Sequence, residues 1–161
     1  MTQLKANSVA IPAKIRHLVI VLGDQLDAQS SALQDLEPTQ DAVWMAEVAE
    51  ESTHVWSAKQ RIAVFLSAMR HFAQDLRALG IPLVYTRLGD AENLGTLALE
   101  LSKTITQLQP SGLVMTAPGD WRVLQSLRAV AAKHQLPLDL RDDTHFFTTV
   151  RDFAAHAKGR K

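Results

Sequence analysis

The sequence contains no cysteine among its 161 residues, and this absence excludes several kinds of chemistry. Disulfide bonds, a thiol nucleophile, Cys-ligated zinc and a Cys-bound iron–sulfur cluster all require cysteine. No apolar run approaches the ~20 residues needed to span a bilayer, and the amino-terminal residues lack an apolar signal segment. We therefore expect a cytoplasmic protein with no membrane partner.

An excess of charge of either sign is also lacking. Lys and Arg total 17, Asp and Glu total 17, and the formal net charge is zero. Such a chain has no broad attraction for nucleic acid or for an anionic membrane. A hydrophobic content of 47% with 21% charged residues is typical of a globular domain. We expect a flexible leader over residues 1–14 and a single domain over residues 15–161.

Short apolar runs alternate with amphipathic segments along the chain. Strands are predicted at 15–22, 42–46, 83–86, 113–116 and 136–140, and helices at 57–79, 94–108, 120–134 and 150–157. Ser57 and Gln60 match a capping box at the start of the longest helix. The alternation favours a doubly wound α/β fold, in which a mostly parallel five-stranded sheet carries helices on both faces.

Three Gly-Asp dipeptides follow predicted strands and end at Asp24, Asp90 and Asp120. In doubly wound folds, ligands bind beyond the carboxyl ends of the strands, at the point where strand order reverses. For Asp90 and Asp120 we favour helix capping over ligand contact. Asp24 follows the strand expected at the centre of the sheet, so capping and ligand contact are equally favoured there.

An acidic run, Glu47, Glu50 and Glu51, follows the second predicted strand near the same edge. Carboxylates there suit the hydroxyls of a ribityl or ribosyl group, or general acid–base catalysis, although a solvated acidic loop is the simpler interpretation. The sequence has no G-x-G-x-x-G, Walker A, G-x-S-x-G or HExxH motif. Residue patterns alone thus leave open a ligand-binding domain, a small enzyme using Asp24, Glu47 and Glu51, or a protein-interaction domain with an unusually apolar docking face.

Five motifs occur in order: LVIVLGDQL, VWMAEVAEE, KQRIAVFLSAMRHFAQDL, LVYTRLGDAEN and APGDWRV. Together they resemble the amino-terminal domain of the deoxyribodipyrimidine photolyase-related proteins, which include iron–sulfur bacterial cryptochromes and prokaryotic (6-4) photolyases. The resemblance implies a Rossmann-like antenna domain carrying 6,7-dimethyl-8-ribityllumazine. It also implies that FAD, the iron–sulfur cluster and DNA contact belong to a helical region of a fuller parent protein, joined in cis or supplied in trans. The chain is then associated with light-driven DNA repair or light sensing, but alone it is not expected to catalyse the lyase reaction of DNA repair.

The resemblance also suggests which residues contact the chromophore: Asp24, Gln25, Glu47, Glu51, His54 and Phe65. Among these, the carboxylates would accept hydrogen bonds from ribityl hydroxyls and ring N–H groups. The chain departs from the family at three places. His54 stands where many members have tyrosine, Ser57-Ala58 replaces a His-His pair, and Gly89-Asp90 replaces Asp-Asp. No metal-binding residues are expected.

Overall fold

A computed structural model describes residues 9–159 of the chain. It contains a five-stranded sheet in the order β3-β2-β1-β4-β5, and every pair of neighbouring strands is parallel. The strands are β1 (His17–Ile20), β2 (Ala42–Ala46), β3 (Leu83–Thr86), β4 (Gly112–Thr116) and β5 (Leu138–Arg141). The predicted doubly wound α/β fold is confirmed.

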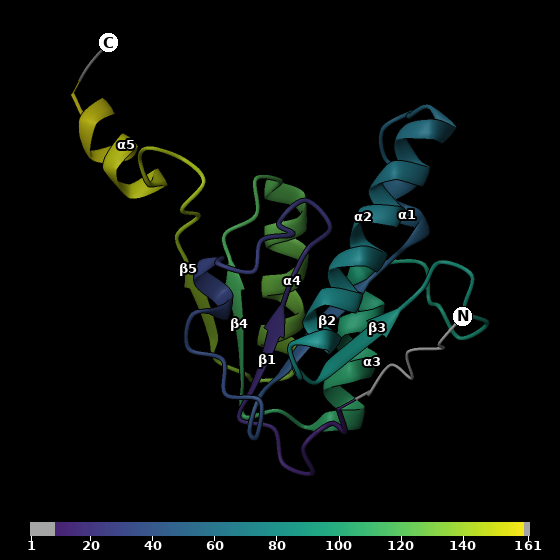
Figure 1. Ribbon diagram of the computed structural model, residues 1–161. Helices are drawn as coiled ribbons and strands as arrows, with labels where there is room; N and C mark the ends of the chain where they lie inside the picture. Colours follow the sequence, from purple (N-terminus) through teal and green to yellow (C-terminus); the bar gives the residue numbers. More distant parts are fainter. Residues whose placement is uncertain (1–8, 160–161) are drawn as a thin grey trace.

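The helices lie on both faces of the sheet (Figure 1). They are η1 (Ser31–Leu33), α1 (Ala49–Thr53), α2 (Lys59–Ala78), α3 (Leu97–Leu108), α4 (Trp121–Lys133) and α5 (Val150–Ala157). One core lies between the sheet and α3 with α4, and the other lies between the sheet and α2 with η1. Helix α5 buries none of its residues and extends away from the sheet (Figure 1).

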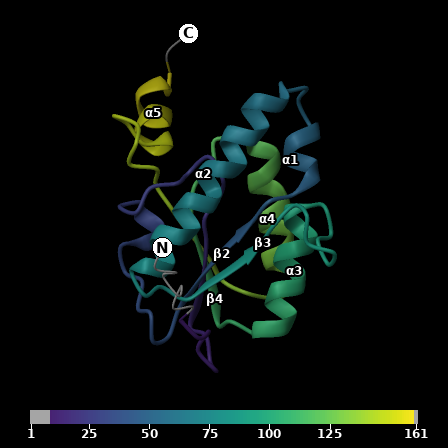
Figure 2. The same cartoon turned by 45° about the vertical axis from the view of Figure 1, so that its right-hand side comes forward.

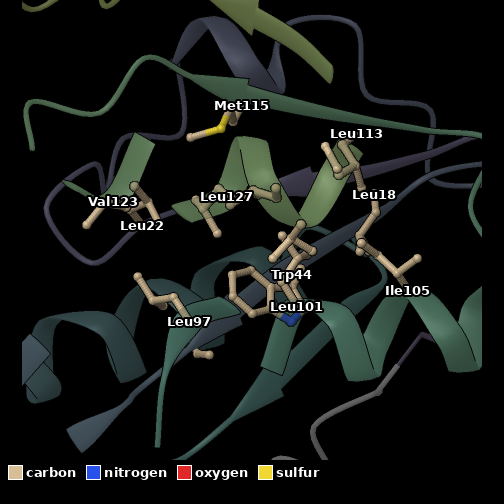
Figure 3. Packing of buried hydrophobic residues seen from close by; sticks show 14 of the residues in the cluster. Leu18, Leu22, Trp44, Leu97, Leu101, Ile105, Leu113, Met115, Val123 and Leu127 are labelled. Atoms are coloured by element: carbon tan, nitrogen blue, oxygen red, sulfur yellow. The ribbon is translucent and has the colours of Figure 1, made fainter. Parts of the chain in front are cut away.

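The three central strands are apolar because both of their faces are covered. All residues of β2 and β4 are buried, whereas the edge strands β3 and β5 are partly exposed. Trp44 of β2 is fully buried in the core beneath α3 and α4, where it lies among Leu97, Leu101 and Leu127 (Figure 3). Its indole N–H donates to the Thr104 hydroxyl over 3.1 Å, so burial leaves no indole donor unpaired.

The capping box predicted at the start of the longest helix is wrong. Helix α2 begins at Lys59 after Ala58, and no side chain caps it. The Ser57 hydroxyl lies one residue too early and donates to the Val55 carbonyl over 3.2 Å instead. Of the two predicted Asp caps, Asp120 does cap α4, whereas Asp90 accepts from the Arg87 N–H in a turn well before α3.

Two short helices were not predicted, and both lie in segments expected to be loops. Helix α1 forms within the acidic run, and η1 lies between β1 and β2. The predicted leader falls partly outside the described residues, which start at residue 9. Residues 9–14 carry no helix or strand, but Ile11 packs against the core beneath α3 and α4. Among residues 9–159, no helix has both the length and the apolar character required to cross a membrane.

Candidate functional site

A crevice of about 330 Å³ opens at the carboxyl ends of the central strands. Strands are added to one side of β1 as the chain passes through β2 and β3, and to the other side through β4 and β5. The order therefore reverses between β1 and β4, and the crevice lies at this reversal, where ligands bind in doubly wound folds. Its walls come from the segments after β1, β2 and β4, from α1 and the loop behind it, and from the first half of α2.

Gly23 brings the end of β1 against α2. A Cβ atom at this position would lie 2.5 Å from Cζ of Phe65 and 2.9 Å from Sδ of Met69, so a larger residue would displace these side chains. Met69 is buried, whereas Phe65 is 39% exposed and faces the crevice. Together with Ile62 and Leu66, Phe65 makes the α2 wall of the crevice largely apolar, and Arg61 of the same helix also lines the crevice.

Asp24 and Gln25 follow Gly23 but occupy different environments. Asp24 lines the crevice, and partial burial together with the negative charges of Glu51 and Asp120 raises the pKa of its carboxyl group. The Gln25 side chain is buried and donates to the Ala117 carbonyl over 2.9 Å. Because Gln25 follows β1 and Ala117 follows β4, this bond joins the loops behind the two strands at the reversal point, and Gln25 lies outside the crevice lining.

Glu47, at the end of β2, has a fully buried carboxylate with four hydrogen bonds. Arg70 donates from Nε over 2.7 Å and from Nη2 over 2.8 Å, and the Tyr85 hydroxyl and the Leu88 N–H complete the set at 2.5 and 3.0 Å. Burial alone would raise the pKa of Glu47, but these donors outweigh burial and hold it below its usual range. Burial of the Tyr85 hydroxyl, together with its hydrogen bond to the negatively charged Glu47 carboxylate, raises the pKa of Tyr85.

Glu51 belongs to α1 and lines the crevice. Arg122, near the start of α4, donates to Glu51 over 2.8 Å and lies 3.6 Å from Glu50 and 3.3 Å from Asp120. The hydrogen bond to Glu51 and the surrounding carboxylates raise the pKa of Arg122. His54 ends α1, is exposed, and also lines the crevice.

Five of the six predicted chromophore residues thus meet at one crevice: Asp24, Glu47, Glu51, His54 and Phe65. Gln25 lies behind it. Sequence reasoning did not find Arg70, Tyr85 or Arg122, which bind the carboxylates at this site. The sequence could have indicated that Glu47 needs a cationic partner, because a glutamate buried at the end of a core strand must be paired, but nothing in it singles out Arg70.

The arrangement suits binding of a small organic molecule. The apolar side chains on the α2 wall can pack against a planar ring system. The carboxylates of Asp24 and Glu51 can accept hydrogen bonds from hydroxyl or N–H groups of a ligand. Within residues 9–159, no three His, Asp or Glu side chains are grouped as a metal site would need.

The fold and the crevice define a doubly wound α/β domain with an open crevice at its reversal point. The sequence pattern of the deoxyribodipyrimidine photo-lyase-related protein family matches residues 19–161, and the chain belongs to this family. A (6-4) photolyase of Agrobacterium fabrum (strain C58 / ATCC 33970) is 39% identical over 144 residues, which cover 89% of this chain and 28% of that protein. The chain therefore spans little more than a quarter of the length of this relative.

Proposed function

We propose that the chain is the chromophore-binding antenna domain of a photolyase-like protein, and that its crevice takes 6,7-dimethyl-8-ribityllumazine. The observation that carries the proposal is the crevice itself, with an apolar wall facing a group of carboxylates at the reversal point of a photolyase-related domain. Its volume of about 330 Å³ falls at the lower end of the range of roughly 300–1,000 Å³ for small-molecule sites.

The residues present fit such a ligand. Phe65 and Ile62 offer an apolar surface to the bicyclic ring, and Asp24 and Glu51 offer acceptors to the ribityl hydroxyls. Glu47 contributes differently, because its four hydrogen bonds already occupy its carboxylate and fix the end of β2 beside α2. When bound, the lumazine would supply absorption of near-ultraviolet to blue light.

The charges around the crevice favour an unphosphorylated ligand. Four carboxylates line it, those of Asp24, Glu47, Glu51 and Asp120, against two guanidinium groups, those of Arg61 and Arg122. Arg122 is already bonded to carboxylates. A phosphate group would add negative charge beside them. We expect ribityllumazine or riboflavin to bind at least about tenfold more tightly than flavin mononucleotide, a difference of about 1.4 kcal/mol.

The remaining functions of a photolyase-like protein would lie in a larger protein. FAD, an iron–sulfur cluster and DNA contact are proposed for a helical region that this domain meets in cis or in trans. The parent protein would then perform light-driven DNA repair or light sensing. The coverage supports this division, because the matched segment makes up 28% of the (6-4) photolyase from Agrobacterium fabrum.

A small enzyme working through Asp24, Glu47 and Glu51 is less well supported. A general base needs a free lone pair directed at the substrate, and both oxygens of Glu47 are engaged by donors from the protein. Arg122 engages one oxygen of the Glu51 carboxylate, so Glu47 is the member of this group that cannot act as a base.

The test is to produce the protein in a riboflavin-making host, extract any pigment and identify it by mass spectrometry. The protein is then titrated with ribityllumazine, riboflavin and flavin mononucleotide, and binding is followed by absorbance difference. We expect a yellow protein, or saturable uptake of ribityllumazine with the phosphorylated flavin weakest. A colourless protein that takes up none of the three ligands would overturn the proposal.

A further inference from the structure

One wall of the crevice is weakly attached to the domain. Residues 49–57, here called the α1 wall, comprise α1 and most of the loop behind it, and lie beside the start of α2 (Figures 1 and 2). Helix α1 buries none of its residues, and Trp56 in the loop is fully exposed. Few buried apolar contacts imply that local opening costs little free energy compared with unfolding of the sheet.

Within the described part of the chain, two polar attachments join the α1 wall to the rest of the domain. The Glu50 N–H donates to the Gly95 carbonyl over 3.0 Å. On the other side, the Arg122 guanidinium reaches Glu51 over 2.8 Å and Glu50 over 3.6 Å. The attachment to Arg122 thus bridges the crevice from α4 to α1.

Arg122 projects from a firmly held element. Its neighbours Val123 and Leu124 are buried, and Asp120 caps the helix by accepting the Arg122 N–H over 2.7 Å. The charged ends of the bridge, by contrast, are partly in water, with 31% of the Arg122 side chain and 31% of the Glu51 side chain exposed. Such an ion pair stabilises its geometry only modestly and weakens with salt.

The Nε atom of Arg122 is buried and has no hydrogen-bond partner among the described residues. A buried donor without an acceptor is unfavourable, so the position that Arg122 takes in the bridge carries a cost. This cost, together with the partial exposure of the ion pair, implies that the bridge to the α1 wall is weak.

We propose that Arg122 is a positioning residue that controls exchange of the ligand in the crevice, by holding the α1 wall closed against α4. The consequence for a ligand rests on the proposed function, whereas the opening of the wall does not. Loss of the Arg122 side chain frees Glu50 and Glu51 while leaving the apolar α2 wall intact.

The first experiment needs no ligand. Amide hydrogen exchange of residues 49–57 is measured by mass spectrometry in the wild type, in Arg122→Gln and in Arg128→Gln. Arg128 is an exposed residue of the same helix and serves as the matched control. We expect exchange to rise about 2- to 5-fold in Arg122→Gln alone, as loss of a partly exposed ion pair predicts, with the strands unchanged.

Salt provides a second comparison. Raising the salt concentration to about 1 M shortens the Debye length to about 3 Å, so wild-type exchange in residues 49–57 should approach that of Arg122→Gln, which should change little. Arg122→Lys keeps the charge but loses the forked geometry, so it should fall between the two. Equal exchange of residues 49–57 in Arg122→Gln and Arg128→Gln would overturn the proposal. So would an exchange rate that depends equally on salt in the wild type and in Arg122→Gln.

The second experiment follows release of bound ribityllumazine after dilution. Arg122→Gln should release it about 2- to 5-fold faster than the wild type and Arg128→Gln. If the proteins bind no ligand but the exchange difference persists, the proposed function fails and the role of Arg122 in holding the wall stands. If ligand binds and leaves at one rate from all three proteins, the role of Arg122 fails and the proposed function stands.

Discussion

Glu47 and Glu51 belong to one acidic run, yet the structure gives them opposite surroundings. The Glu47 carboxylate is fully buried and accepts four hydrogen bonds from Arg70, Tyr85 and Leu88. The Glu51 side chain is 31% exposed, lines the crevice and bonds to Arg122. The difference shows that neighbouring carboxylates can shape a crevice in two ways: Glu47 fixes the end of β2, whereas Glu51 lines the crevice. Under the proposed function, Glu51 is the one that faces the ligand.

The largest effect is expected from Glu47→Gln. An amide nitrogen would face the Arg70 guanidinium, the Tyr85 hydroxyl or the Leu88 N–H, so donors would oppose donors in a buried place. We expect the free energy of unfolding to fall by about 2–4 kcal/mol, measured by urea denaturation and circular dichroism. Glu50→Gln, at a partly exposed residue 3.6 Å from Arg122, is the control and should change it by less than about 0.5 kcal/mol.

The stability difference between the wild type and Glu47→Gln also depends on pH. Because the folded protein holds the pKa of Glu47 below its unfolded value of 4.5, this carboxylate stabilises the fold above about pH 4.5. That contribution is lost as the pH falls through the lower, folded value. Wild type and Glu47→Gln should therefore converge in stability below that value. A constant difference from pH 7 down to acid would contradict the electrostatic role of Glu47.

A smaller loss is expected from Gly23→Ala. The new methyl group would lie 2.5 Å from Cζ of Phe65, so the ring must shift. Phe65 is partly exposed and able to move, and we expect a loss of about 1–2 kcal/mol in unfolding free energy together with weaker ligand binding. Gly89→Ala, where no atom lies within 4 Å of the added Cβ, is the control. Phe65→Leu in the Gly23→Ala background should restore most of the stability, because the contact with Sδ of Met69 at 2.9 Å remains. No recovery at all would show that the contact with Phe65 is not the cause.

The smallest effect is expected from Asp24→Asn, and its sign is opposite. The folded protein raises the pKa of Asp24 above its unfolded value of 3.8, so ionised Asp24 destabilises the fold once the pH exceeds the folded value. Below the unfolded value the carboxyl is protonated in both states and this effect vanishes. Asp24→Asn should therefore raise the melting temperature slightly at pH 7 and leave it unchanged in acid. A lower melting temperature at pH 7 would contradict the assigned environment.

The sheet could be predicted from the sequence because its buried strands are continuous apolar runs. Strand β2 was predicted over its observed residues, as were β3 and α5. Helix α1 could not be predicted in this way. It has five residues, two of them glutamate, and no apolar face, so no periodicity marks it.

The candidate site was predictable in position but not in detail. Parallel strands end at one edge, so Asp24, Glu47 and Glu51 were expected to meet there, and they do. The directions of adjacent side chains in a loop depend on backbone turns that periodicity does not describe. For this reason the sequence did not indicate that Asp24 lines the crevice whereas Gln25 points behind it. Partners such as Arg70, which is 23 residues from Glu47, depend on tertiary packing.

The comparison of the two glutamates is tested most directly by titrating Glu51→Gln with ribityllumazine and measuring its unfolding free energy in the same buffer. Glu51→Gln should retain wild-type stability within about 0.5 kcal/mol, because its side chain is partly exposed. Its affinity for ribityllumazine should fall about 5- to 20-fold, as the loss of a charged acceptor predicts. Wild-type affinity in Glu51→Gln, or a loss of stability as large as in Glu47→Gln, would contradict the account.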